Sequence, residues 1–104
     1  MCDRRKIDEI ARIIFDISKA KDVYLFGSHA RGNPDKNSDI DIAIIKKKIR
    51  DKHKELYSLR KSLFAKWVPM DLVMFEEADF KKNREILGTL QHEIYKTGKK
   101  LSGK

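Results

Sequence analysis

Residues that cross-link or interrupt a chain are scarce in these 104 residues, which contain one cysteine and two prolines. With Cys2 alone no internal disulfide can form, which is typical of proteins of the reducing cytosol. No apolar run approaches the roughly 18 residues of a transmembrane helix, and the N-terminal residues lack the apolar core of a signal peptide. We therefore expect a cytoplasmic protein without a membrane partner.

The chain also lacks internal repeats, low-complexity tracts and any linker rich in proline or glycine. At this length we expect one domain that spans residues 1–104. Hydrophobic residues make up 40% of the chain, which is enough for a folded core. The formal net charge of +8 favours an anionic partner or substrate, such as a nucleotide, a nucleic acid or an acidic protein. Solubility alone is the alternative explanation of this charge.

Hydrophobic periodicity predicts a sheet covered by helices. Apolar residues at helical spacing predict helices at about 4–20, 51–66 and 79–97, the first capped by Asp3 and the last closed by Gly98. Residues with high β propensity predict strands at Val23–Phe26, Asp39–Ile45 and Val68–Phe75. A short helix is expected to begin at Gly27 and Ser28, between the first two strands.

Two aspartates, Asp39 and Asp41, interrupt the isoleucine-rich second strand. Side chains alternate along a strand, so both carboxylates share one face with Ala43, while the isoleucines at 40, 42 and 44 form the core face. Carboxylates held about 6–7 Å apart at the backbone repel each other unless a cation lies between them. Mg²⁺ takes such oxygen ligands. Because Asp-x-Asp pairs are common, a solvent-facing acidic pair is the alternative without further support.

A third aspartate, Asp71, supplies that support, because it interrupts the apolar third strand. Its neighbours are expected to be largely buried, where an unpaired charge is costly. Either it pairs with a lysine or arginine, or its strand lies beside Asp39–Ile45. In the second arrangement all three carboxylates converge on the same metal ions.

The turn after the first strand has the residues of an anion-binding site. Gly27 lets a phosphate approach the backbone closely, and Ser28 can donate its hydroxyl while a helix N-terminus supplies N–H groups. Arg31 adds a cation one turn further on. A Gly-Ser turn alone is usually only a helix cap, but one loop separates this turn from the acidic pair.

The stretch GSHARGNPDKNSDID at residues 27–41 resembles the hallmark of the nucleotidyltransferase superfamily: Gly-Ser, a spacer, then Asp-x-Asp. VPMDLVMF at 68–75 resembles the strand with its third carboxylate. A ten-residue spacer in so short a chain is similar to the minimal nucleotidyltransferases, the MntA-type antitoxins found beside HEPN-domain toxins. The resemblance implies an α+β fold with a mixed β-sheet flanked by helices, the polymerase beta-like nucleotidyltransferase fold.

The same resemblance implies ATP as a substrate and two Mg²⁺ ions as cofactors. Asp39 and Asp41 would bridge both metals, and Asp71 would hold the metal nearer the incoming hydroxyl and help to remove its proton. Gly27 and Ser28 would hold the triphosphate, with Arg31 as a further contributor. AMP would pass to a tyrosine of a HEPN toxin, which forms a hetero-oligomer with the antitoxin and loses its ribonuclease activity.

Three other functions stay open. One is an antitoxin that binds its partner without catalysis, and another is a nucleotidyltransferase that modifies a small molecule. The third is nucleic-acid binding, suggested by KKKIRDKHK at residues 46–54. Since no aromatic stacking pattern is evident near this charge run, we expect a solvated face and no nucleic-acid partner. Tyr57, Trp67 and Tyr95 are expected to pack in the core or against a partner.

Overall fold

The protein folds into a four-stranded sheet with four helices in its described part. This computed structural model describes residues 4–27, 40–64 and 70–101. The elements in chain order are α1 (Arg4–Ser18), β1 (Asp22–Phe26), β2 (Ile40–Lys46), α2 (Lys52–Leu63), β3 (Met70–Glu76), α3 (Glu77–Asn83), α4 (Leu90–Thr97) and β4 (Lys99–Leu101). The predicted short helix after Gly27 and the Asp3 cap lie outside the described residues.

The sheet is mixed, with strand order β3-β2-β1-β4. β1 pairs antiparallel with both β2 and β4, whereas β2 and β3 run parallel. The β2–β3 connection contains α2, as a parallel crossover requires. The predicted α+β class with a mixed sheet flanked by helices is therefore confirmed.

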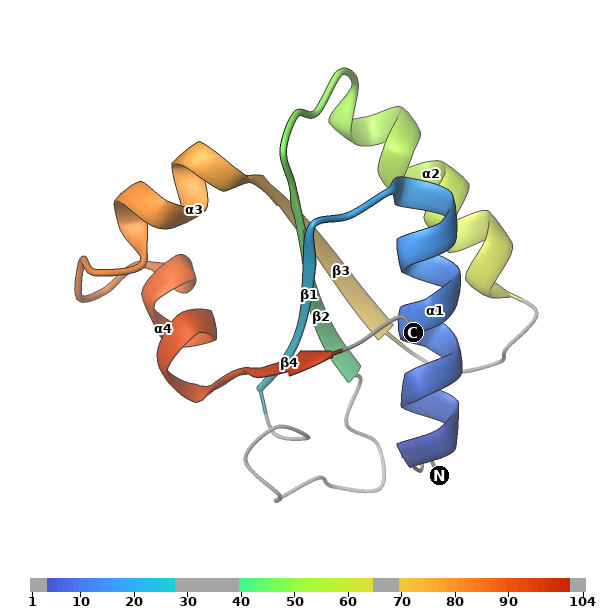
Figure 1. The fold of residues 1–104 in the computed structure, drawn as a ribbon, viewed down its shortest axis with the longest axis horizontal. Coiled ribbons are helices and arrows are strands. Elements are labelled where there is room, and N and C mark those ends of the chain that lie inside the picture. Colours follow the sequence, from blue (N-terminus) through green and yellow to red (C-terminus); the bar gives the residue numbers. More distant parts are fainter. Residues whose placement is uncertain (1–3, 28–39, 65–69, 102–104) are drawn as a thin grey trace.

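Helices cover both faces of this sheet. Figure 1 shows α1 and α2 on one side, and α3 and α4 on the other. The side with α1 and α2 holds the larger core, which includes the following buried residues: Ile7, Ile10, Ile14, Val23, Leu25, Ile40, Ile42, Ile44, Leu59, Leu63, Leu72 and Met74. The other core is smaller and consists of Phe26, Ala43, Ile45, Phe80 and Ile94, with partly buried neighbours. Both faces of β2 are thus buried along most of its length.

The predicted helix at 79–97 is wrong as a single element, because the chain forms two helices there. α3 ends at Asn83 and α4 begins at Leu90. Between them Gly88 adopts φ +90°, a left-handed conformation that a continuing helix excludes. Thr89 then caps α4, since its hydroxyl accepts a hydrogen bond from the backbone N–H of His92 at 3.1 Å. The break lets α3 and α4 pack as separate helices on one face of the sheet.

The other boundaries agree with the sequence to within a few residues, and β4 is an element that the sequence did not predict. Asp51 caps α2 by accepting a hydrogen bond from the Lys54 backbone N–H at 3.2 Å. Gly98 ends α4, as predicted, although with φ −74° rather than a left-handed turn.

Among the described residues, no helix combines the length and apolar character that crossing a bilayer requires.

Candidate active site

Asp41 and Asp71 lie side by side at one end of the sheet. They are register partners on the parallel strands β2 and β3, whose backbones lie about 4.8 Å apart. Register partners of a parallel pair project from the same face, so the two carboxylates share a face. The prediction that the strand of Asp71 lies beside that of Asp41 is confirmed.

The face that carries these carboxylates is buried further along and open at their end. Ala43 and Ile45 follow Asp41 on the same face and are fully buried under α3 and α4. Asp41 itself is only half-buried, and Asp71 is exposed. A ligand can therefore reach both carboxylates, while the sheet behind them is fixed by packing.

The surroundings of Asp71 differ from the sequence prediction. Its neighbours in the chain were expected to enclose it, so that its charge would need a partner. Leu72 and Met74 are indeed buried, but they belong to the core under α1 and α2, on the opposite face. Because strand residues alternate between faces, burial of these neighbours leaves Asp71 in solvent. Hydration alone can stabilise its charge, so its geometry rather than its burial makes it a candidate ligand.

Gly27 supports the carboxylate of Asp41 directly. It follows β1, whose last residue Phe26 is the register partner of Asp41. A Cβ atom added to Gly27 would overlap Oδ2 of Asp41 and would lie 3.2 Å from its Cγ. Gly27 also has φ +75°, which disfavours any other residue. From the sequence, the predicted role of Gly27 was to let a phosphate approach the backbone closely. The structure shows that the absence of a side chain at Gly27 also makes room for the carboxylate of Asp41.

The rest of the predicted site lies outside the described residues. This applies to Asp39, Ser28 and Arg31. Within the described ranges no group of three or more histidine, cysteine, aspartate or glutamate side chains could hold a metal. Asp41 and Asp71 provide two of the three predicted carboxylates. Their carboxylate oxygens can be reached from solvent and are the type of ligand that Mg²⁺ prefers.

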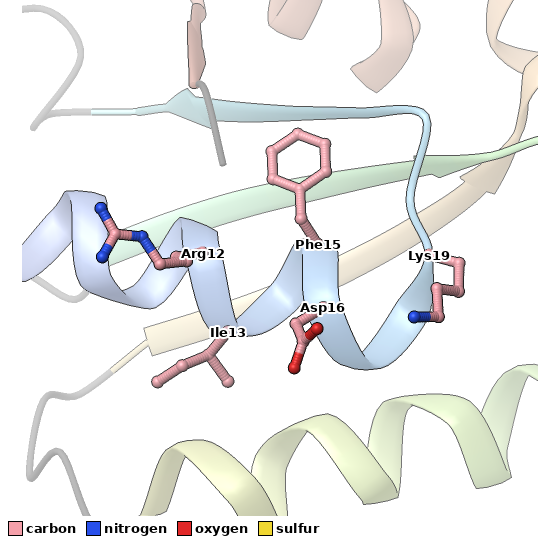
Figure 2. A pocket seen from close by; sticks show the side chains of 5 residues that line it. All are labelled: Arg12, Ile13, Phe15, Asp16 and Lys19. Atoms are coloured by element: carbon pink, nitrogen blue, oxygen red, sulfur yellow. The ribbon is translucent and has the colours of Figure 1, made fainter. Parts of the chain in front are cut away.

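A hollow elsewhere on the surface is unrelated to these carboxylates. It has a volume of about 500 Å³ and is lined by Arg12, Ile13, Phe15 and Asp16 on α1 and by Lys19, which directly follows that helix. Figure 2 shows Ile13 and Asp16 on one side of the helix and Phe15 on another. Since α1 covers the sheet face opposite Asp41 and Asp71, we do not include the hollow in the site.

Fold and site together define a class of protein. The family described as "Polymerase beta, Nucleotidyltransferase" matches residues 6–104, so the chain belongs to this nucleotidyltransferase family. No curated protein sequence matches the chain.

Solved structures give more particular likenesses. One is a chain of a mutant MntA–HpeT toxin–antitoxin, in which two aspartates spaced one residue apart are replaced by glutamate. It is 27% identical, with a TM-score of 0.64 over 99% of this chain and 75% of that one. A chain of a toxin–antitoxin with AMP-PNP is 26% identical, with a TM-score of 0.58 over 95% and 73% of the two chains.

A third likeness, in fold alone, is to a chain of the complex between the tri-AMPylated Shewanella oneidensis HEPN toxin and its MNT antitoxin. Its identity is 24% and its TM-score is 0.56, over 97% of this chain and 72% of that chain. The chain is thus similar over nearly its whole length to chains from toxin–antitoxin complexes.

Proposed function

We propose that this protein is a Mg²⁺-dependent nucleotidyltransferase that transfers AMP from ATP to a tyrosine hydroxyl of a HEPN toxin, as the antitoxin of the pair. The observation that carries the proposal is the register of Asp41 with Asp71, beside the glycine that accommodates the Asp41 carboxylate. Family membership supports the reaction class. The relatives with AMP-PNP and with an AMPylated HEPN toxin support the donor and the acceptor.

Asp39, Asp41 and Asp71 are the residues that would hold the two Mg²⁺ ions. The two described carboxylates suit the role because they share a face, lie on adjacent strands and reach solvent. The double aspartate-to-glutamate mutant of the MntA relative has the same one-residue spacing as Asp39 and Asp41, which supports a role for the pair. When bound, the ions neutralise charge that develops on the phosphate oxygens during transfer.

The chain's own side chains would orient the reactants for in-line displacement. Gly27, with no side chain, leaves the backbone open to the triphosphate, which Ser28 and Arg31 would help to hold. The acceptor oxygen then bonds to the α-phosphorus as the bond to the leaving oxygen breaks and pyrophosphate departs. Asp71, which is more exposed than Asp41, would take the hydroxyl proton.

The test uses the purified protein, Mg²⁺, ATP labelled on the α-phosphate and the HEPN-type product of the adjacent gene. We expect the label on a tyrosine of the partner and release of pyrophosphate. Asp41→Asn and Asp71→Asn should each lower the rate about 100-fold or more, because each removes a charged oxygen ligand. Asp16→Asn removes one exposed carboxylate from α1 and serves as the matched control. It should transfer AMP at the wild-type rate.

Two outcomes would contradict the proposal. Labelling that persists in both active-site variants would place the chemistry elsewhere. Neutralisation of the toxin without any labelling would favour an antitoxin that acts by contact alone. Calorimetry separates these cases further, since we expect ATP binding that depends on Mg²⁺ and is lost in Asp41→Asn.

A further inference from the structure

Two segments of this protein are strongly basic. Residues 46–64 contain eight lysines and arginines but only two acidic residues, a net charge of +6, and residues 81–104 contain seven against two, a net charge of +5. Within the described residues, Lys46 pairs with Glu55, and Lys52 lies 5.7 Å from the centre of the Phe75 ring. The charge of Lys47 acts on Glu77 and helps to lower its pKa.

Helix α2 arranges part of this charge on one face together with aromatic rings. Leu59 and Leu63 point into the core, and the opposite side of the helix is exposed. At 100° per residue, six exposed side chains fall within about one third of the helix circumference, directed away from these leucines. They are His53, Lys54, Tyr57, Arg60, Lys61 and Phe64, and we name them the α2 outer stripe.

Two aromatic rings in this stripe are largely exposed. Tyr57 was expected to pack in the core or against a partner; with 67% of its surface exposed it lies outside the core, which leaves contact with a partner, and Phe64 is 71% exposed. The charge run was judged to be a solvated face because no aromatic pattern was evident nearby. Helical spacing places Tyr57 between Lys54 and Lys61, so the missing aromatic pattern is present on the folded helix.

Three cations of the stripe form no ion pair with the part of the chain that the structure describes. Within residues 4–27, 40–64 and 70–101, the side chains of Lys54, Arg60 and Lys61 form none of the ion pairs. No acidic residue belongs to the stripe. The partner that complements this face is therefore an anion with charges spread along about 15 Å, the helix length from residue 54 to residue 64.

We propose that the α2 outer stripe binds single-stranded nucleic acid. Lysine is depleted in protein–protein interfaces, whereas lysine and arginine provide the usual contacts to phosphates. Exposed aromatic side chains stack on unpaired bases, and every base offers such a surface. At a rise of about 3.4 Å per nucleotide, 15 Å spans roughly four nucleotides. Cations for the backbone and rings for the bases thus occur together on one helix face.

This surface is separate from the candidate active site. α2 covers the sheet face opposite the one that carries Asp41 and Asp71. Binding of a nucleic acid should therefore persist in the presence of saturating ATP and Mg²⁺. The proposal also stands or falls independently of AMP transfer.

Fluorescence anisotropy with labelled single strands of about 12 nucleotides, in RNA and DNA forms, tests the proposal at salt concentrations from about 50 to about 200 mM. Lys54→Ala/Lys61→Ala should weaken binding and reduce the slope of log affinity against log salt by about 1.4, since each phosphate contact contributes about 0.7. The matched control Lys82→Ala/Lys96→Ala removes the same charge from exposed sites on α3 and α4. It should leave the slope unchanged.

The aromatic contribution is measured separately. Tyr57→Ala/Phe64→Ala should weaken binding at least about fivefold, whereas Tyr57→Phe keeps the ring and should bind as wild type does. Circular dichroism confirms that each variant folds. Binding of RNA, DNA or both with this pattern supports the proposal, and a preference identifies the natural strand. Three results would overturn the proposal. They are no binding at low salt, an equal loss of binding in Lys82→Ala/Lys96→Ala, and no loss of binding when Tyr57 and Phe64 are both replaced by alanine.

Discussion

Replacing Gly27 with alanine tests the link between the turn after β1 and the carboxylate of Asp41. The new Cβ would overlap Oδ2 of Asp41 and lie 3.2 Å from Cγ and 3.5 Å from Cβ of the same side chain. The backbone cannot easily relieve this overlap, because Phe26 and Asp41 are register partners in the sheet. The carboxylate must therefore rotate away from its position beside Asp71.

The expected cost has two parts. Alanine at φ +75° costs about 1–2 kcal/mol relative to glycine, since the left-handed region is unfavourable for L-residues. Moving the Asp41 carboxylate costs up to about 1 kcal/mol more, because the side chain is short and partly open to solvent. The effect on transfer should be much larger, about 100-fold, since a shift of roughly 1 Å in a positioned group has that consequence.

Gly88 provides a matched control for the backbone cost. It also has positive φ, at +90°, but an added Cβ would meet nothing within 4 Å. Gly88→Ala should lower the free energy of unfolding by about 1–2 kcal/mol and leave AMP transfer unchanged. Urea denaturation and the labelled-ATP assay measure the two properties for both variants.

A double-mutant cycle isolates the overlap itself. In an Asp41→Ala background, the excess cost of Gly27→Ala over Gly88→Ala should disappear, giving a coupling of about 0.5–1 kcal/mol. If Gly27→Ala transfers AMP at the wild-type rate, or if its stability cost is the same with and without the Asp41 carboxylate, the reasoning is refuted.

Three further predictions concern the scaffold. Burial acts to raise the pKa of Glu55, but the hydrogen bond and charge of Lys46 outweigh it and hold that pKa below its ordinary value of 4.5. Glu55→Gln should therefore cost about 1–2 kcal/mol at neutral pH. This difference from wild type should shrink as the pH falls below 4.5 through the folded-state pKa, in pH-dependent urea titrations. Phe80→Ala should cost about 3–5 kcal/mol in the same denaturation, because the ring is 3% exposed, whereas Leu87→Ala, at 84% exposed, should change stability by less than about 0.5 kcal/mol. Gly98→Ala would place a Cβ atom against the Ile94 carbonyl oxygen and should lower the free energy of unfolding by about 1–3 kcal/mol. An unchanged midpoint of urea denaturation would contradict this contact.

Strands and helices with strong periodicity were predictable from the sequence, and the elements that depend on single residues were not. The runs around Val23 and Ile42 were predictable as strands because they are short and rich in β-branched and aromatic residues, which strands favour. The break between α3 and α4 depends on the left-handed conformation of Gly88 and on capping by Thr89. β4 is too short to carry a periodic pattern and exists because β1 offers it an edge.

For the candidate site, the sequence identified the aspartates of β2 and β3 but could not place them relative to one another. Spacing along one strand determines which of its side chains share a face, so the relation of Asp41 to the isoleucines followed from alternation alone. The register between β2 and β3 depends on how α2 packs across the sheet, which involves residues far apart in the chain. Similarly, the exposure of Asp71 depends on where the helices end. Its apolar neighbours in the chain predicted buried surroundings, whereas Asp71 is exposed.

Chain chemistry by itself therefore determined the class of this protein: a helix-covered sheet with aspartates on two of its strands and a glycine at the turn after β1. Those properties are local, because residue type and spacing set them before any long-range contact forms. Tertiary structure alone decided that Asp41 meets Asp71 across two parallel strands, that Gly27 makes room for the Asp41 carboxylate, and that Tyr57 lies among lysines on the outside of α2. These relations arise only when both faces of the sheet are buried, since that packing selects one strand register and one outward face for each helix.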